Sequence, residues 1–213
     1  QPKLPDMVFT ANAGLTIGKK FIPSNFRHQE RSGEAPHFAR WMKEHGYEVA
    51  WLPVDLYFEG EGDALFAGDV LFCGYKFRSD INSHRAVADM LGCLVISVEL
   101  VDPRFYHLDT CFCPLPDGSA FWFPAAFDGY GQRTIRDHVG DLIDVPEEEA
   151  VHFSCNAVVL SHDIVLPEGA PNLVATLQAR GYQCHPLPMS EFLKAGGACK
   201  CLTMFMPQRE NCA

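Results

Sequence analysis

Apolar residues recur with helical spacing in four separate stretches of this 213-residue chain. Within each stretch they are one, three or four residues apart, which places them on one face of a helix. The four groups are Phe38, Trp41 and Met42; Val87, Met90 and Leu91; Ile135, Val139 and Leu142; and Leu173, Val174 and Leu177. The sequence therefore predicts four amphipathic helices.

Short apolar runs flank each predicted helix and predict β-strands. Two runs precede each helix, and one follows it, at 47–54, 93–100, 141–146 and 182–189. Gly46, Gly92 and Gly181 stand where a left-handed residue commonly ends a helix. Gly140 falls inside the third predicted helix and fits less well. Each unit is thus strand, strand, helix, strand, and several units must pack together because one cannot bury its own apolar faces.

One polar side chain stands in the segment that opens each unit. Asn12, Glu59, His107, Asn156 and Cys201 follow one another at intervals of 47, 48, 49 and 45 residues. A fixed period of this size is typical of repeats, and repeats around an axis bring equivalent positions together. The fifth unit opens at Cys201 but stops at Ala213. We therefore expect roughly forty to sixty residues, most of one repeat, to precede Gln1 in the intact protein.

Composition narrows the class of protein. The chain is 47 % hydrophobic and 21 % charged and has no apolar run long enough to cross a bilayer, so residues 1–213 are expected to form a single domain. The net charge of −10 disfavours nucleic acids and anionic membranes as partners. Nine cysteines without zinc-finger spacing favour free buried thiols in a reducing cytoplasm, and they predict no metal or cofactor.

Cys201 is the strongest candidate for a nucleophile. It holds a repeat position, follows the Gly196-Gly197 pair, and lies beside Lys200, which would point to the opposite face of an expected strand. Nearby positive charge favours the reactive thiolate, and a bound cation could supply that charge. The alternative is a buried cysteine that packs as a small hydrophobe, which we expect of most others in the chain.

Acidic residues near the same positions indicate a cation site. On the expected strands His107 shares a face with Asp109, and Glu59 shares one with Glu61 and Asp63. Histidine beside a carboxylate can act as an acid/base, and a guanidinium between Glu59 and Asp109 would offset the repulsion among the acids. The alternative, above all for Glu61, is a solvated acidic turn.

Seven residues are weaker candidates for substrate contacts. The amides of Asn12 and Asn156 can donate and accept together, although both could be turn residues. An arginine can clamp a carboxylate, although a surface salt bridge is the alternative for each one here. Asp6 either binds a substrate amino group or caps a turn. The remaining candidates are Arg31, Arg78, Arg104 and Asp63.

Five motifs resemble those of a known enzyme family. PDMVFTANAG, FEGEGDAL, FRSD, DPRFYHLDT and GGACKCLT stand in this order from Pro5 to about Thr203. They are similar to motifs of the guanidino-group-modifying enzymes of the pentein superfamily, which include arginine deiminase, dimethylarginine dimethylaminohydrolase, glycine amidinotransferase and arginine dihydrolase. The resemblance implies a five-bladed α/β propeller, with its fifth unit incomplete in this chain, and a small cationic guanidino substrate such as arginine.

The resemblance also implies roles for the candidate residues. Cys201 would attack the guanidinium carbon to give a covalent thiouronium intermediate, and His107 would protonate the leaving amine and then activate water. Glu59 and Asp109 would bind the guanidinium. The substrate carboxylate would be held by Arg31 and Arg78.

Two departures from the family pattern bear on the substrate. Asn12 replaces the aspartate of deiminases and dimethylaminohydrolases, and an amide suits a neutral ureido group, which favours a dihydrolase that releases two ammonias and yields ornithine. Dimethylaminohydrolases do not usually keep an acid at the place of Asp109, so the methylation state of the substrate stays open. The insertion in FEGEGD leaves Glu59 or Glu61 as the binding acid, and the period favours Glu59.

Other functions stay open at this point. An amidinotransferase would use an amine in place of water as the second nucleophile. A non-catalytic pentein binding module is the alternative outside enzymology, although the Cys201 and His107 pair argues against it. An inactive fragment is a further alternative. The sequence does not determine the oligomeric state, and a homodimer is one candidate.

Overall fold

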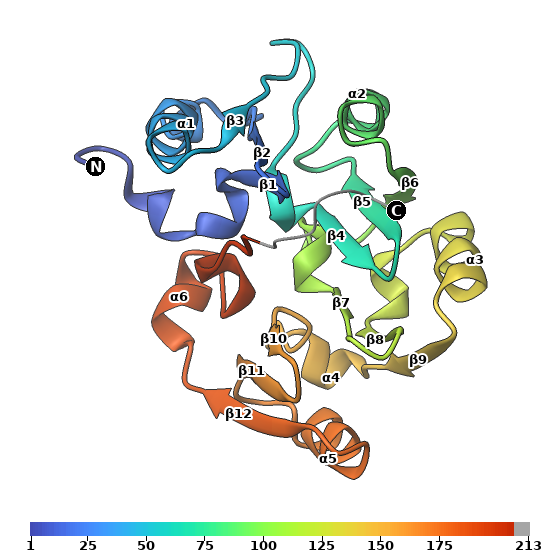
Figure 1. Ribbon diagram of the computed structural model, residues 1–213. Coiled ribbons are helices and arrows are strands. Elements are labelled where there is room, and N and C mark those ends of the chain that lie inside the picture. Colours follow the sequence, from blue (N-terminus) through green and yellow to red (C-terminus); the bar gives the residue numbers. More distant parts are fainter. Residues whose placement is uncertain (207–213) are drawn as a thin grey trace.

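The computed structural model describes residues 1–206 as four small sheets, each with one helix, arranged around a common centre (Figure 1). In every sheet the first two strands are antiparallel and the third is parallel to the second. The helix makes the return that a parallel pair needs. The predicted order of strand, strand, helix, strand is therefore confirmed four times.

The units follow one another along the chain. The first contains β1 (Gly14–Ile17), β2 (Lys20–Pro23), α1 (Ala35–Glu44) and β3 (Glu48–Val49). The second contains β4 (Ala64–Ala67), β5 (Val70–Tyr75), α2 (Ile81–Leu91) and β6 (Leu94–Glu99). The third contains β7 (Phe112–Pro114), β8 (Ser119–Trp122), α3 (Gly129–His138) and β9 (Asp141–Asp144). The fourth contains β10 (Val158–Leu160), β11 (Asp163–Pro167), α5 (Pro171–Ala179) and β12 (Gln183–Leu187). Two short helices, α4 (Glu147–Ala150) and α6 (Ser190–Lys194), lie in the connections.

Three of the helices begin and end close to the predicted positions. Their apolar faces turn inward, as the burial of Met42, Val87 and Leu173 shows. The backbone is left-handed at Gly46, Gly92 and Gly181, just after α1, α2 and α5. Glycine adopts this conformation without steric cost, so these residues allow each helix to stop and the chain to turn.

Two predicted boundaries were wrong. The third helix ends at His138, and Val139 is already extended, so Leu142 belongs to β9 and not to the helix. The run 47–54 contributes only Glu48–Val49 to a sheet. In both places apolar residues lie at the transition between elements, where hydrophobic spacing alone cannot separate helix from strand.

The segments that carry the five repeat positions are single turns and not strands. Four of them hold a short 3₁₀ helix: η2 (Thr10–Ala13), η4 (Gly60–Gly62), η5 (Leu108–Thr110) and η7 (Lys200–Leu202). The remaining segment, which opens the fourth unit, is the turn that precedes Asn156. Such turns are stable in short pieces, and here they bring backbone groups of neighbouring units into contact.

Hydrogen bonds join these five turns into a closed ring. Each turn contacts the next one through one side chain and one backbone group. The links in order are Asn12 Nδ2 to Glu59 O (3.3 Å), Leu108 N to Asp63 Oδ1 (3.1 Å), Asn156 Nδ2 to Asp109 O (3.2 Å), Cys201 N to Asn156 Oδ1 (3.1 Å) and Thr10 Oγ1 to Leu202 O (2.8 Å). The expectation that equivalent positions meet at the centre is therefore confirmed.

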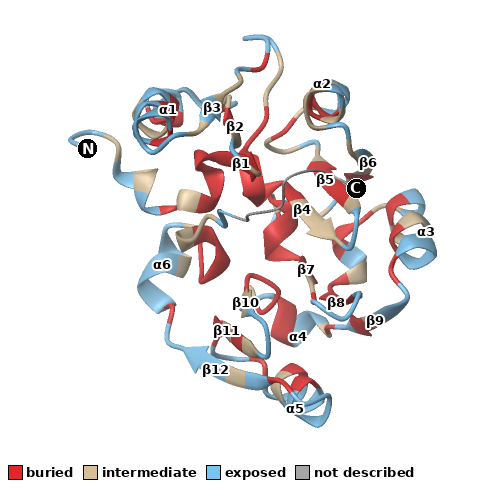
Figure 2. Ribbon diagram, in the orientation of Figure 1, coloured by how far each residue is buried: buried red, intermediate tan, exposed pale blue. Residues whose placement is uncertain are grey.

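Burial follows this arrangement. Figure 2 shows buried residues concentrated around the centre and on the inner sides of the helices, with the outer helix faces exposed. The α/β propeller-like form is as expected, while the number of blades in the intact protein stays a prediction. None of the helices within residues 1–206 has the length and apolar character needed to cross a bilayer.

Candidate active site

Cys201 lies in η7, where its side chain is held between two other turns of the ring. Its thiol donates to Asp109 Oδ2 at 3.6 Å, and Asn156 Nδ2 donates to its sulfur at 3.1 Å. Only 4 % of the residue is exposed. Asn156 thus holds both the backbone and the sulfur of Cys201, which fixes the direction of the thiol.

The surroundings keep this thiol protonated when no ligand is bound. Burial raises the pKa of Cys201, and the nearby charge of Asp109 raises it further. The backbone of Ala198, the amide of Asn156 and the charge of Lys200 act in the opposite direction but are outweighed. A positive charge brought close to the sulfur would shift the balance toward the thiolate.

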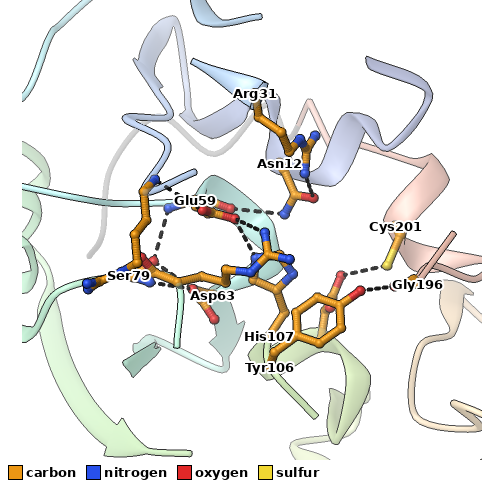
Figure 3. Close-up of polar contacts among 12 residues, drawn as sticks. Asn12, Arg31, Glu59, Asp63, Ser79, Tyr106, His107, Gly196 and Cys201 are labelled. Carbon is orange, nitrogen blue, oxygen red and sulfur yellow. Dashed lines mark hydrogen bonds and ion pairs between the residues drawn. The ribbon is translucent and has the colours of Figure 1, made fainter. Parts of the chain in front are cut away.

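His107 and Glu59 form a buried acid and base pair. His107 Nε2 lies 2.8 Å from Glu59 Oε2, and the two side chains point toward each other from neighbouring turns (Figure 3). Burial alone would raise the pKa of Glu59, but the hydrogen bond and charge of His107, together with the charges of Arg78 and Arg31, lower it to about 2. Burial alone would lower the pKa of His107, yet the surrounding carboxylates raise it. Both shifts favour an imidazolium next to a carboxylate in this pair.

Asp109 has one oxygen that residues 1–206 leave without a hydrogen-bond partner. Oδ2 accepts from Cys201, whereas Oδ1 is buried and has no hydrogen-bond partner within residues 1–206. Burial raises the pKa of this carboxyl to about 6, although His107 and Lys200 oppose the shift. A buried carboxylate oxygen without a donor is costly, so Oδ1 is suited to receive an N–H group from a ligand.

The two glutamates of the FEGEGD motif point to different partners. Glu59 contacts His107, whereas Glu61 accepts from Lys200 Nζ at 2.7 Å and from Phe205 N at 3.0 Å. The period thus selected the glutamate that reaches the histidine. The expected strand faces were wrong for these residues, for His107 with Asp109, and for Lys200, because a 3₁₀ turn does not alternate sides as a strand does.

Arg31 and Asn12 are locked together beside Glu59. The Arg31 Nε and Nη2 atoms each donate to one oxygen of Glu34 at 2.9 Å, and its Nη1 donates to Asn12 Oδ1 at 2.8 Å. The guanidinium also reaches the backbone carbonyl of Asp6 at 3.1 Å, so Asp6 contributes its main chain to this contact. The bond from Arg31 fixes the amide of Asn12 with its nitrogen toward Glu59 (Figure 3).

Asp63 is held by the protein at both oxygens. Oδ2 accepts from the backbone and hydroxyl of Ser79, at 3.2 Å and 2.6 Å, and Oδ1 accepts from Leu108 N at 3.1 Å. Ser79 in turn accepts from Glu59 N at 3.0 Å. Asp63 therefore supports the turns that carry Glu59 and His107, which differs from the substrate contact expected of it.

Arg78 and Arg104 have different environments. Arg78 Nη1 lies 3.2 Å from Glu59 Oε2, and its side chain is 21 % exposed, at the edge of the buried cluster. Arg104 pairs with Asp102 and Glu147 at the surface, which is the surface salt bridge that was the alternative for this residue. Of the arginines considered, Arg78 alone combines contact with the cluster and access to solvent.

Three residues that contribute to the site were either not predicted from the sequence or predicted to point elsewhere. Tyr106 precedes His107 directly and lies under Arg78, with its ring centroid 4.6 Å from the Arg78 Cζ. Glu34 follows Arg31 by three residues, a spacing at which a helical turn brings opposite charges together. Lys200 was noticed beside Cys201 but expected to point away. No group of three metal-binding side chains occurs among the described residues.

Comparisons with known proteins show the family to which this chain is similar. A profile of the family described as N,N dimethylarginine dimethylhydrolase, eukaryotic, matches residues 1–206. The bifunctional arginine dihydrolase/ornithine cyclodeaminase ArgZ of Synechocystis sp. is 48 % identical over 204 residues, 94 % of this chain and 29 % of that protein. The N(G),N(G)-dimethylarginine dimethylaminohydrolase of Mycobacterium tuberculosis is 41 % identical over 202 residues, 94 % of this chain and 66 % of that enzyme.

The structural comparison gives the same result. A variant of the ArgZ N-terminal domain, covalently bound to a reaction intermediate, matches with a TM-score of 0.95 at 46 % identity, over 98 % of this chain and 79 % of that one. The present chain spans less than a third of the length of the curated ArgZ protein. On the family profile and these relatives, the chain belongs to the N,N-dimethylarginine dimethylhydrolase family, within the pentein superfamily of guanidino-group-modifying enzymes.

Proposed function

We propose that residues 1–213 form the catalytic domain of a cysteine-dependent hydrolase that acts on the guanidinium of arginine or a close derivative. The observation that carries this proposal is the contact between Cys201 Sγ and Asp109, whose second oxygen has no hydrogen-bond partner among the described residues. A planar cation that satisfies Asp109 Oδ1 would lie against the sulfur that has to attack it. Holding both partners at contact distance removes much of the entropic barrier to reaction.

Binding would prepare the nucleophile. A guanidinium between Asp109 and Glu59 would form charge-assisted hydrogen bonds with both carboxylates. Its positive charge would lie next to the Cys201 thiol and lower the pKa that burial and Asp109 have raised. The thiol would then release its proton to solvent, and the thiolate would form only when a cationic substrate is present, so the free enzyme would be protected from unspecific reactions.

His107 would move the protons of both half-reactions. In the first, Cys201 Sγ bonds to the guanidinium carbon, and His107 gives its proton to the nitrogen that leaves as ammonia or an amine. In the second, His107 takes a proton from water, the oxygen bonds to the same carbon, and the carbon–sulfur bond breaks to restore Cys201. The buried Glu59 next to His107 stabilises the imidazolium before the first step.

Arginine dihydrolysis is the form of this reaction that we favour. Asn12 keeps its carbonyl on Arg31 and presents its nitrogen to the site. A second N–H of that nitrogen can donate to the oxygen of a ureido group, so the first product would be held for a second hydrolysis that ends in ornithine. The similarity to the arginine dihydrolase ArgZ supports this choice.

The setting of the protein follows from its thiols and charge. Among residues 1–206, seven cysteines carry free thiols, and all of these but the half-buried Cys184 are buried: Cys73, Cys111, Cys113, Cys155, Cys184, Cys199 and Cys201. Free thiols persist where the surroundings are reducing, so we place the enzyme in the cytoplasm. Its net charge of −10 suits a small cationic substrate and neither nucleic acid nor an anionic membrane.

Product analysis tests the proposal. The protein is incubated with arginine, monomethylarginine, dimethylarginine or citrulline, and the products are identified by mass spectrometry beside Cys201→Ser. We expect ammonia and ornithine from arginine, none from Cys201→Ser, and a loss of at least about a hundredfold in kcat for His107→Ala. Near wild-type turnover in either variant would refute the mechanism.

Two controls sharpen this test. His185→Ala removes an exposed histidine that pairs with Asp163 far from the ring, and it should leave turnover unchanged. Addition of glycine or lysine to the arginine reaction tests amidinotransfer, which would appear as a new guanidino product. Such a product at a rate above hydrolysis would replace the hydrolase proposal.

A further inference from the structure

We propose that Tyr106 is a positioning residue that couples the nucleophile to the arginine at the edge of the site. Its hydroxyl holds the turn before Cys201, and its ring supports Arg78. This inference rests on the proposed function. It assumes that the substrate guanidinium lies at Cys201, near the Tyr106 hydroxyl, and that the substrate carboxylate lies at Arg78, near the Tyr106 ring.

The hydroxyl end contacts the segment that leads to the nucleophile. Tyr106 Oη donates to the carbonyl of Gly196, five residues before Cys201, and Figure 3 shows the hydroxyl directed at that glycine. Gly196 has a left-handed backbone with φ of 85°, and a Cβ there would collide with the same hydroxyl. The turn and the tyrosine are therefore fitted to each other, and the bond joins the third unit to the fifth.

The ring end contacts the arginine. Arg78 Cζ lies 4.6 Å from the centroid of the Tyr106 ring, a distance at which the cation is attracted to the aromatic face. On the other side, Arg78 Nη1 lies 3.2 Å from Glu59. Within residues 1–206, Glu59 is the only side chain that hydrogen-bonds to this guanidinium, so its remaining N–H groups can receive a substrate carboxylate.

The two contacts make separate demands that two substitutions can distinguish. Tyr106→Phe keeps the ring under Arg78 and removes only the bond to Gly196. Tyr106→Leu removes both the bond and the aromatic face. If the hydroxyl positions Cys201, Tyr106→Phe should lower kcat. If the ring positions the arginine that binds the substrate carboxylate, only Tyr106→Leu should change the preference for one substrate over another.

Kinetics with two substrates provide the test. Arginine is compared with agmatine, which carries the same guanidinium but no carboxylate. We expect Tyr106→Phe to lower kcat by about tenfold, with KM for arginine nearly unchanged, since one hydrogen bond is lost. We expect Tyr106→Leu to lower kcat as well and also to raise KM for arginine by about tenfold. KM for agmatine should stay nearly unchanged, so that the preference for arginine over agmatine shrinks.

Cys201 labelling gives an independent readout. The rate at which a haloacetamidine alkylates the Cys201 thiol should fall in Tyr106→Phe by a factor similar to kcat, with the melting temperature close to that of the parent. Tyr130→Phe and Tyr130→Leu, at an exposed tyrosine on α3, are the matched controls and should change none of these values.

Three results would overturn the inference. One is an unchanged kcat and labelling rate in Tyr106→Phe. Another is an equal loss with arginine and agmatine in Tyr106→Leu. The third is a general drop in melting temperature that accounts for both variants, with restored kinetics on cooling. If the parent protein hydrolyses no guanidino compound, the proposed function fails instead, and the labelling rate still reports on the link between Tyr106 and Cys201.

Discussion

Glu59 and Asp109 are both buried carboxylates, yet their surroundings give them different ionisation. Burial raises the pKa of each, but the bond and charge of His107 with the nearby arginines bring Glu59 down to about 2. At Asp109 the charges of His107 and Lys200 offset less of the effect of burial, so its pKa stays raised, to about 6. Glu59 is therefore charged throughout the useful pH range, whereas Asp109 titrates within it.

This difference predicts the pH dependence of substrate binding at the residue scale. Asp109 is ionised above a pH of about 6 and takes up a proton below it, so its attraction for a cation is present at neutral pH and lost on acidification. In Cys201→Ser, which cannot react, the Kd of arginine should rise as the pH falls through about 6. Calorimetry between about pH 8 and about pH 5 measures this, in the range where an ordinary aspartate stays charged.

A second change provides the control for that experiment. Adding Asp109→Asn to Cys201→Ser should weaken arginine binding at neutral pH and remove most of its pH dependence. A Kd that is constant over this range in the single variant would show that Asp109 does not carry the charge that binds the cation.

Asn12 gives a second prediction at the same scale. Asn12→Asp replaces the N–H that faces the site with a carboxylate oxygen, which repels the carbonyl of a ureido group. We expect the ratio of citrulline to ornithine formed from arginine to rise by about tenfold, the effect of one hydrogen bond turned into a repulsion. Mass spectrometry of a single time course measures the ratio, and an unchanged ratio would count against the dihydrolase form of the reaction.

At the scale of elements, the repeat period was a better guide than local conformation. Asn12, Glu59, His107, Asn156 and Cys201 do lie in adjoining turns of the ring, because equivalent positions in a repeat meet whatever their local structure. The same segments were expected to be strands. In a 3₁₀ turn successive side chains point about a third of a rotation apart, so the predicted faces failed. Lys200 was thereby placed on the face opposite to Cys201, and its pairing with Glu61 could not be foreseen.

The Lys200 and Glu61 pair ties η7 to η4 across the ring. Both side chains are buried and 2.7 Å apart. Lys200→Met would leave Glu61 buried without its cation, which typically costs about 3–5 kcal/mol in the free energy of unfolding. Urea unfolding measures this loss. The double change Lys200→Met with Glu61→Leu should recover most of it, because two apolar side chains of similar size can pack there.

An exposed pair of the same kind is the control. Lys194 and Glu191 are also 2.7 Å apart but lie in solvent on α6, so Lys194→Met should have almost no effect on stability. If Lys200→Met is as harmless as Lys194→Met, the buried pair does not hold the two turns together.

At the scale of the whole molecule, hydrophobic spacing and the period together predicted the four units and their arrangement around a centre. They could not predict how closely the turns approach. Gly60 in η4 has φ of 58°, and a Cβ there would come within 2.5 Å of the carbonyl oxygen of Gly14 in the first unit. Contacts of this kind depend on how units dock, which no local pattern encodes.

Gly60 therefore offers a test of ring closure. Gly60→Ala should lower stability more than Gly92→Ala, which has a similar φ of 67° but open space around the added carbon. Both variants carry the left-handed strain of about 1 kcal/mol, and only Gly60→Ala also pushes two units apart. In Gly60→Ala the free energy of unfolding, measured with urea, and the rate of arginine turnover should both fall. Equal losses in Gly60→Ala and Gly92→Ala would contradict this account.

The ring also has a consequence for how activity arises. Each side chain of the constellation comes from a different turn, about one repeat apart along the chain: Asn12, Glu59, His107, Asn156 and Cys201. Arg31 bonds to Asn12 from the short 3₁₀ helix Gln29–Arg31, and Tyr106 bonds to Gly196 in the segment before Cys201. No contiguous piece of sequence holds the constellation, so the proposed activity requires all of these turns to be docked together. We therefore expect turnover to disappear on heating before the individual units melt.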